Sequence, residues 1–164
     1  MILKYFTKNF YTNFLIIIFL FIIDRISKFY VIYISQKNLD PEIYTSSFLN
    51  IILIWNNGIA FGLLSSENNY FYNSITILIS IIVIILIFLI SKSKSFTKFA
   101  YILVTSGALG NLFDRLLYKS VPDFLDLHYN DFHWFIFNIA DIFITLGIIC
   151  LIYDEFFLEK KNND

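Results

Sequence analysis

Four long apolar blocks dominate the sequence and constrain its fold more than any other feature. They cover residues 13–34, 70–90, 99–117 and 137–157. A helix rises about 1.5 Å per residue, so each block can cross the roughly 30 Å hydrocarbon layer of a bilayer. Hydrophobic residues make up 58% of the chain, and no linker or shift in composition divides it. We therefore expect a single all-α membrane domain over residues 1–164, with four transmembrane helices and a small extracytoplasmic β element.

The placement of lysines predicts how these helices are oriented. They gather at both ends of the chain and between the second and third blocks, as Lys4, Lys8, Lys92, Lys94, Lys98, Lys160 and Lys161. The connections over residues 35–69 and 118–136 each contain a single lysine. Because cytoplasmic connections are enriched in Lys and Arg, we expect a multi-pass protein with both termini in the cytoplasm. The two lysine-poor connections then lie outside.

The first outer connection contains a run that is too short to cross a membrane. Residues 48–55 are mostly apolar and lead into Asn56-Asn57-Gly58, a sequence that suits the positive φ angles of a tight turn. We predict a strand over residues 48–55. Residues 59–64 are apolar again and are expected to form either a second short strand or an interfacial helix. A small sheet at the membrane surface would follow.

Several polar side chains lie inside or beside the apolar blocks. Asp24 and Lys28 are four residues apart, so they can pair on one face of the first helix, and we interpret them as a structural pair. In the third block, Asn111 and Asp114 share a face. An unpaired amide facing lipid costs roughly 1–3 kcal/mol, so Asn111 is expected to face a polar cavity. Asp114 and Arg115 are interpreted equally well as an interfacial ion pair or as part of a site.

Two aspartates can meet at the outer end of the last two helices. Asp123 lies just beyond the third block, and Asn138 and Asp141 share a face in the first turn of the fourth. Antiparallel neighbouring helices would bring Asp123 and Asp141 to one depth as a dyad. The alternative has equal weight: Asp141 merely complements the positive end of its helix, and Asp123 is an ordinary loop carboxylate.

Five groups of residues, in order, resemble the motifs of bacterial lipoprotein signal peptidase, also called signal peptidase II. They are Asp24 to Lys28, Asn56-Asn57-Gly58-Ile59-Ala60-Phe61-Gly62, Gly107 to Arg115, Val121 to Phe124, and Phe137 to Asp141. The resemblance covers nearly the whole chain. It departs from the family pattern at Ser106 and Lys119, where glycine is common, and at Pro122, where an aliphatic residue is usual.

The resemblance implies an aspartic endopeptidase of the bacterial inner membrane. Its substrates would be prolipoproteins, cleaved on the amino side of a diacylglyceryl-modified cysteine at the extracytoplasmic face. The catalytic aspartates of the family match Asp123 and Asp141. The supporting or substrate-binding positions match Asn56, Asn111, Asp114, Arg115 and Asn138.

No metal or other cofactor is expected, because His128, His133 and the distant Cys150 form a poor zinc site. Both histidines are interpreted as interfacial loop residues. We expect a monomer that contacts membrane lipids and binds no nucleic acid. Two other functions remain open from the residues alone. One is a di-aspartyl intramembrane peptidase of the prepilin or presenilin type, and the other is a small transporter or channel subunit with a polar path.

Overall fold

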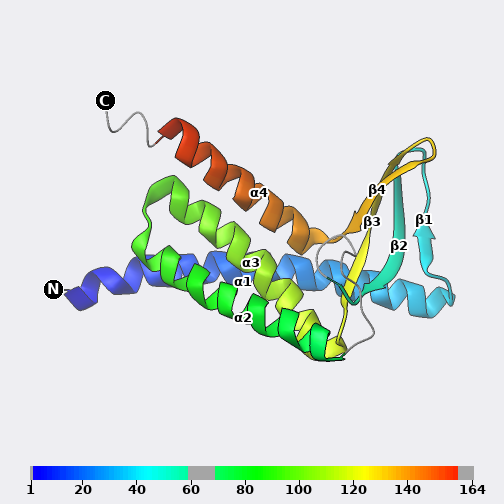
Figure 1. Ribbon diagram of the computed structural model, residues 1–164, viewed down its shortest axis with the longest axis horizontal. Coiled ribbons are helices and arrows are strands. Elements are labelled where there is room, and N and C mark those ends of the chain that lie inside the picture. Colours follow the sequence, from blue (N-terminus) through cyan, green and yellow to red (C-terminus); the bar gives the residue numbers. More distant parts are fainter. Residues whose placement is uncertain (1, 59–68, 159–164) are drawn as a thin grey trace.

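The computed structural model describes residues 2–58 and 69–158, and most of this part of the chain is helical. The helices are α1 (Ile2–Asn38), α2 (Asn69–Lys92), α3 (Ser95–Tyr118) and α4 (Ile139–Tyr153), the last followed by the π-helical turn η2 (Asp154–Leu158). The strands are β1 (Glu42–Tyr44), β2 (Leu49–Asn56), β3 (Val121–Tyr129) and β4 (Phe132–Phe137). Figure 1 shows α2, α3 and α4 toward one end of the molecule and the sheet at the other, with α1 running along both.

The first three apolar blocks each lie within one helix, whereas the fourth begins differently from the prediction. Phe137 ends β4, and Asn138 caps α4, which starts at Ile139. By length and composition, one helical segment of the described residues, Tyr72–Lys92, is apolar enough to cross a membrane. Large apolar side chains of α2 such as Ile77, Ile84 and Phe88 are exposed. An exposed apolar surface of this extent is unusual in a water-soluble protein.

The sheet is antiparallel in the order β1-β2-β3-β4. The strand predicted over residues 48–55 is confirmed as β2. Its neighbours are β1 and β3, and the expected partner over residues 59–64 lies outside the described residues. Residues 118–136, which the sequence analysis identified only as an outer connection, form most of the hairpin of β3 and β4. Asp123 therefore lies in a strand, opposite Ile54 of β2.

Glycines let α3 pack closely against its neighbours. A Cβ added to Gly107 would collide with the backbone oxygen of Ala140 in α4, and one added to Gly110 would lie 2.6 Å from an Asp24 oxygen in α1. Gly107 thus allows α4, and Gly110 allows α1, to approach α3 closely. The third helix ends at Lys119, which has a φ of 57°. A left-handed residue at this position explains why glycine is common there.

Candidate active site

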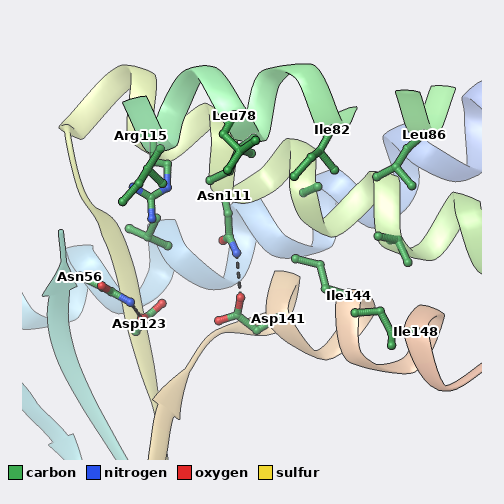
Figure 2. Close-up of a pocket in the computed structure, with 15 residues that line it drawn as sticks. Asn56, Leu78, Ile82, Leu86, Asn111, Arg115, Asp123, Asp141, Ile144 and Ile148 are labelled. Atoms are coloured by element: carbon green, nitrogen blue, oxygen red, sulfur yellow. Dashed lines mark hydrogen bonds between the residues drawn. The ribbon is translucent and has the colours of Figure 1, made fainter. Parts of the chain in front are cut away.

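A cavity of about 630 Å³ lies where α2, α3 and α4 meet the sheet (Figure 2). Its polar side chains come from β2, α3, β3 and α4, and they are Asn56, Asn111, Arg115, Asp123 and Asp141. Aliphatic side chains of α2, α3 and α4 line the rest, among them Leu78, Ile82 and Ile144. The cavity therefore combines an apolar wall with two carboxylates.

Asp123 is held by two amide side chains. It is 3% exposed and accepts hydrogen bonds from Asn56 Nδ2 at 2.8 Å and from Asn138 Nδ2 at 2.6 Å. Asn56 reaches it from β2, because the pairing of β2 with β3 places both at the same end of the sheet. Burial, together with the nearby charge of Asp141, raises the pKa of Asp123 to about 7. A carboxyl group in this range can both hold and release a proton near neutral pH.

Asp141 lies in the first turn of α4, where a capping box fixes it. The Asn138 side chain accepts from the Asp141 backbone N–H, and the Asp141 carboxylate accepts from the Asn138 backbone N–H at 3.1 Å. Asn111 Nδ2 of α3 donates to the other Asp141 oxygen at 2.8 Å, as Figure 2 shows. Asn138 thus contacts both aspartates, since its amide nitrogen also donates to Asp123. The structure brings the two aspartates to one cavity.

Arg115 is buried at the rim of the same cavity, and it does not pair with Asp114. Its Nη2 donates to the backbone oxygen of Gly58, and its guanidinium lies 5.4 Å from the centroid of the Tyr72 ring. Its Nε and Nη1 are buried without a hydrogen-bond partner in the described part of the chain. Two N–H donors in the cavity wall are therefore available to an acceptor.

The charges inside the helix bundle form one buried network. Lys28 Nζ donates to Asp114 Oδ2 at 2.7 Å and to Asn111 Oδ1 at 2.8 Å, and it lies 3.1 Å from Asp24 Oδ1. The predicted pairing of Asp24 with Lys28 is confirmed. Asp114, for which we left an ion pair with Arg115 open, pairs instead with Lys28 and Arg25. Asn111 connects this network to Asp141, so the network supports the site from behind.

Sequence reasoning missed Arg25, which bridges Asp24 and Asp114. Its charge inside an apolar block was the available signal, because a charge in a membrane helix is costly unless it has a partner. It also lies over the rings of Phe21 and Phe113. The side chain therefore joins α1 to α3 through both charge and apolar contact.

The expectation that both histidines are loop residues was wrong. His128 lies in β3 and His133 in β4, where they form a cross-strand pair. Asp126, which the sequence analysis did not single out, lies beside them, and potential metal-ligand atoms of the three residues are all within 4.8 Å of one another. Cys150, half-buried in α4, is a free thiol as expected.

Comparison with known proteins identifies the family. Residues 16–157 match the family model described as signal peptidase (SPase) II. The chain is 50% identical over 158 residues to a lipoprotein signal peptidase of Pelagibacter ubique, covering 96% of this chain and 95% of that protein. It is 41% identical over 150 residues to one of Rickettsia bellii, covering 90% of this chain and 75% of that protein.

The fold agrees with solved structures. A structure described as a bacterial membrane enzyme superposes with a TM-score of 0.75 at 34% identity, covering 93% of this chain and 92% of that one. A second gives a TM-score of 0.71, also at 34% identity, with 89% and 93% covered. The transporter or channel alternative is not favoured by these matches. The chain belongs to the signal peptidase II family, the membrane aspartic peptidases that remove signal peptides from prolipoproteins.

Proposed function

We propose that Asp123 and Asp141 are the acid and base with which this peptidase cleaves prolipoproteins, on the amino side of a diacylglyceryl-modified cysteine. The observation that carries the proposal is their shared setting. Each carboxylate accepts a side-chain amide hydrogen bond, each is buried, and both line one cavity. The charge of Asp141 disfavours ionisation of Asp123. The pair therefore tends to keep one shared proton rather than to ionise at both carboxyl groups.

The shared proton allows hydrolysis without a nucleophilic side chain. One carboxylate takes a proton from water as the oxygen attacks the scissile carbonyl carbon, while the protonated partner donates to the carbonyl oxygen. The tetrahedral intermediate then breaks its carbon–nitrogen bond as a proton passes to the leaving nitrogen. Asn56, Asn111 and Asn138 hold the carboxylates in place through the bonds described above. Arg115 Nε and Nη1, which have no hydrogen-bond partner among residues 2–58 and 69–158, would donate to a substrate carbonyl.

The apolar wall of the cavity suits the rest of such a substrate. Ile75, Leu78, Ile82 and Leu86 follow one another along α2, and Ile144 and Ile148 face them from α4. A signal segment and two acyl chains are apolar, and inside a bilayer such groups bind an apolar wall through van der Waals packing rather than through removal from water. The lipid group then selects the substrate while the aspartates act on the peptide.

The proposed setting is the bacterial inner membrane, crossed four times by a single-domain monomer, over residues 13–34, 70–90 and 99–117 and through α4, which starts at Ile139. Figure 1 supports this arrangement, because the start of α1 and the end of α4 lie at the same end of the bundle. The sheet and the two aspartates lie at the opposite end. With the lysine-rich end in the cytoplasm, the aspartates act at the extracytoplasmic face.

The test replaces each aspartate separately by asparagine and measures cleavage of a diacylglyceryl-modified prolipoprotein in detergent. Either variant should lose about 100- to 10,000-fold in turnover, the usual contribution of general acid–base catalysis. Asp131→Asn is the matched control, because Asp131 is an exposed carboxylate in the turn between β3 and β4. It should retain full activity.

Two outcomes would contradict the proposal. Wild-type turnover in a correctly folded Asp123→Asn or Asp141→Asn variant would remove that residue from the pair. Equal cleavage of the unmodified precursor would instead reject the lipid-modified cysteine as the determinant of the substrate.

A further inference from the structure

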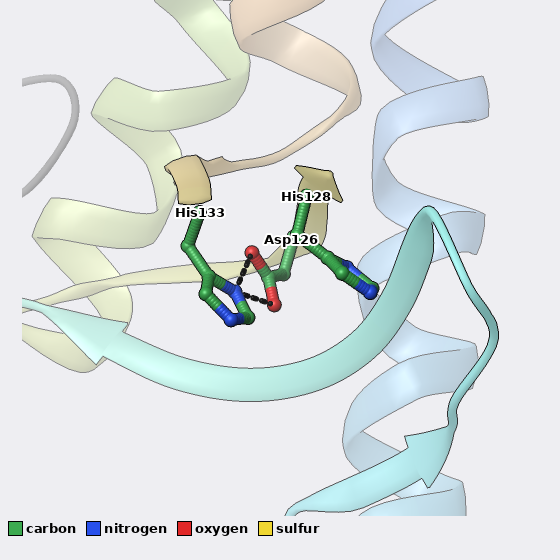
Figure 3. Close-up of side chains that lie close together, drawn as sticks. All are labelled: Asp126, His128 and His133. Atoms are coloured by element: carbon green, nitrogen blue, oxygen red, sulfur yellow. Dashed lines mark hydrogen bonds and ion pairs between the residues drawn. The ribbon is translucent and has the colours of Figure 1, made fainter. Parts of the chain in front are cut away.

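A second cluster of titratable side chains lies on the sheet, separate from the cavity of the two aspartates. It consists of Asp126 and His128 from β3 and His133 from β4 (Figure 3). None of the three lines that cavity. Their potential ligand atoms all lie within 4.8 Å of one another, a spacing that one ion at about 2.0–2.2 Å from each ligand can bridge after small side-chain adjustments.

The strands bring these residues together without help from a mobile loop. Asp126 and His128 are two residues apart in β3, with a shift of register between them, and their potential ligand atoms nevertheless lie close together. His133 is the cross-strand partner of His128. The two imidazole rings are stacked, with centroids 5.0 Å apart and planes inclined by 19°. The hairpin thus holds two imidazoles side by side.

Asp126 is fixed between its neighbours. It is 2% exposed, and Asn50 Nδ2 of β2 donates to its Oδ2 at 3.1 Å. His133 Nδ1 lies 2.9 Å and 3.1 Å from its two oxygens. This contact holds the imidazole beside the carboxylate, so small side-chain movements would bring both to one ion as ligands. His133 itself is more than half exposed, so an ion can reach it.

The third residue of the cluster, His128, has an unusual hydrogen-bonding environment. His128 Nδ1 is buried and has no hydrogen-bond partner within residues 2–58 and 69–158. Buried polar atoms in folded proteins almost always have a partner. A bound cation would supply one.

We propose that Asp126, His128 and His133 form a binding site for a divalent transition-metal ion, with Zn²⁺ as its representative. Two imidazoles and a carboxylate suit Zn²⁺, Cu²⁺ or Ni²⁺, whereas Mg²⁺ and Ca²⁺ favour oxygen ligands. The sequence-based expectation of no metal considered only the histidines and Cys150, and the proposal revises it. The ion joins β3 to β4 and thereby steadies the strand that carries Asp123. It takes no part in peptide cleavage.

The test measures Zn²⁺ binding to the full chain in detergent by calorimetry, after chelator treatment and with a purification tag that contains no histidine. Because the chain has two histidines, and both belong to the cluster, we expect about one Zn²⁺ per chain. His128→Ala, His133→Ala and Asp126→Asn should each weaken binding at least about tenfold, as loss of a ligand or of its orienting partner does. Asp131→Asn, in the same hairpin, and Asp123→Asn, in the cavity, should bind Zn²⁺ as the wild type does.

A structural readout accompanies binding. Zn²⁺ should raise the unfolding temperature of the wild type but not that of the double variant His128→Ala/His133→Ala. Undiminished binding in that double variant, or no saturable binding to the folded wild type, would overturn the proposal. Binding lost in Asp123→Asn and kept in the histidine variants would place the ion in the cavity and also overturn it. None of these readouts is peptidase activity, so their failure leaves the proposed roles of Asp123 and Asp141 untouched.

Discussion

Asp123 titrates under the control of its immediate neighbours. Its pKa of about 7 reflects burial and the charge of Asp141, both of which favour the protonated form, and is opposed by hydrogen bonds from Asn56 and Asn138. As pH rises through about 7, the pair loses its shared proton and with it the acid needed at the substrate carbonyl. We therefore expect peptidase activity to fall on the alkaline side of neutrality.

Replacing Asn56 by alanine should change the pH at which activity falls, that is, move the alkaline limb of the pH profile. Asn56 donates to the ionised form of Asp123, so its loss disfavours that form and raises the pKa of Asp123 further. The limb should shift to higher pH by on the order of one unit, the equivalent of a hydrogen bond worth about 1.4 kcal/mol. The measurement is kcat/KM against pH, which reports groups of the free enzyme.

Asn50→Ala provides the matched control for this prediction. Asn50 lies on the same strand but donates to Asp126, outside the cavity. Its pH profile should coincide with that of the wild type. A profile of Asn56→Ala that is merely lower, with its alkaline limb unmoved, would show that Asn56 does not set the proton affinity of Asp123.

At this scale the sequence predicted residues better than it predicted their partners. Asp24, Lys28, Asn111 and the two aspartates of the cavity were all singled out from spacing, polarity and family motifs. The bridging role of Arg25 was missed, and so was Asp126, because Arg25 pairs with Asp114 and Asp126 accepts from Asn50, partners that lie far away in the chain. Local spacing describes one helix face, whereas a buried charge is matched by whatever tertiary packing brings near.

Among the elements, α1 and α3 are joined by buried charges, and Lys28 is their centre. Its ammonium contacts three oxygen acceptors, from Asp24, Asn111 and Asp114. Lys28→Met should lower the free energy of unfolding in detergent by about 3–5 kcal/mol, because it leaves two buried carboxylates, Asp24 and Asp114, with the single positive charge of Arg25 between them. Denaturant titration would measure the loss.

Lys92→Met is the control for that change, since Lys92 is exposed at the end of α2. Its effect should stay within about 0.5 kcal/mol. Equal unfolding free energies for the two variants would mean that the buried network does not stabilise the bundle.

The crossing of α3 and α4 depends on Gly107. A methyl group there would press on the Ala140 backbone, next to Asp141. Gly107→Ala should therefore cost about 1–3 kcal/mol through overpacking and reduce turnover by separating Asn111 from Asp141. Leu116→Ala, at an exposed position of the same helix, should change neither quantity appreciably. Unaltered stability and turnover in Gly107→Ala would show that the helices can move apart without cost.

Helices were easier to predict than strands in this chain. The expected blocks over residues 70–90 and 99–117 lie within α2 at Asn69–Lys92 and α3 at Ser95–Tyr118. These helices could be predicted because a long apolar run has few structures other than a helix open to it. The hairpin of β3 and β4 was missed. Apolar and polar residues alternate only partly along the hairpin, which contains Pro122. It is held by contacts with β2, more than 60 residues earlier in the chain. Strand pairing of this kind is not visible in a local window.

For the whole molecule, orientation in the membrane is the property to test. Single cysteines introduced by Lys94→Cys and Asp131→Cys into a Cys150→Ser background would mark opposite ends of the protein. An impermeant maleimide should label the Asp131→Cys variant in intact spheroplasts and the Lys94→Cys variant only after lysis. The reverse pattern would invert the proposed topology and place the cavity in the cytoplasm.

Asn138 links the two halves of the cavity, and this has a consequence for the order in which the protein is made. It binds Asp123 of β3 and Asp141 of α4 at once, and α4 leaves the ribosome after β3. A nascent chain that has not yet inserted residues 138–141 contains only one of the two aspartates. On the proposed roles of the two aspartates, we expect hydrolytic capacity to arise only once α4 has been inserted, so a chain that still lacks α4 should not cut peptides near it in the membrane.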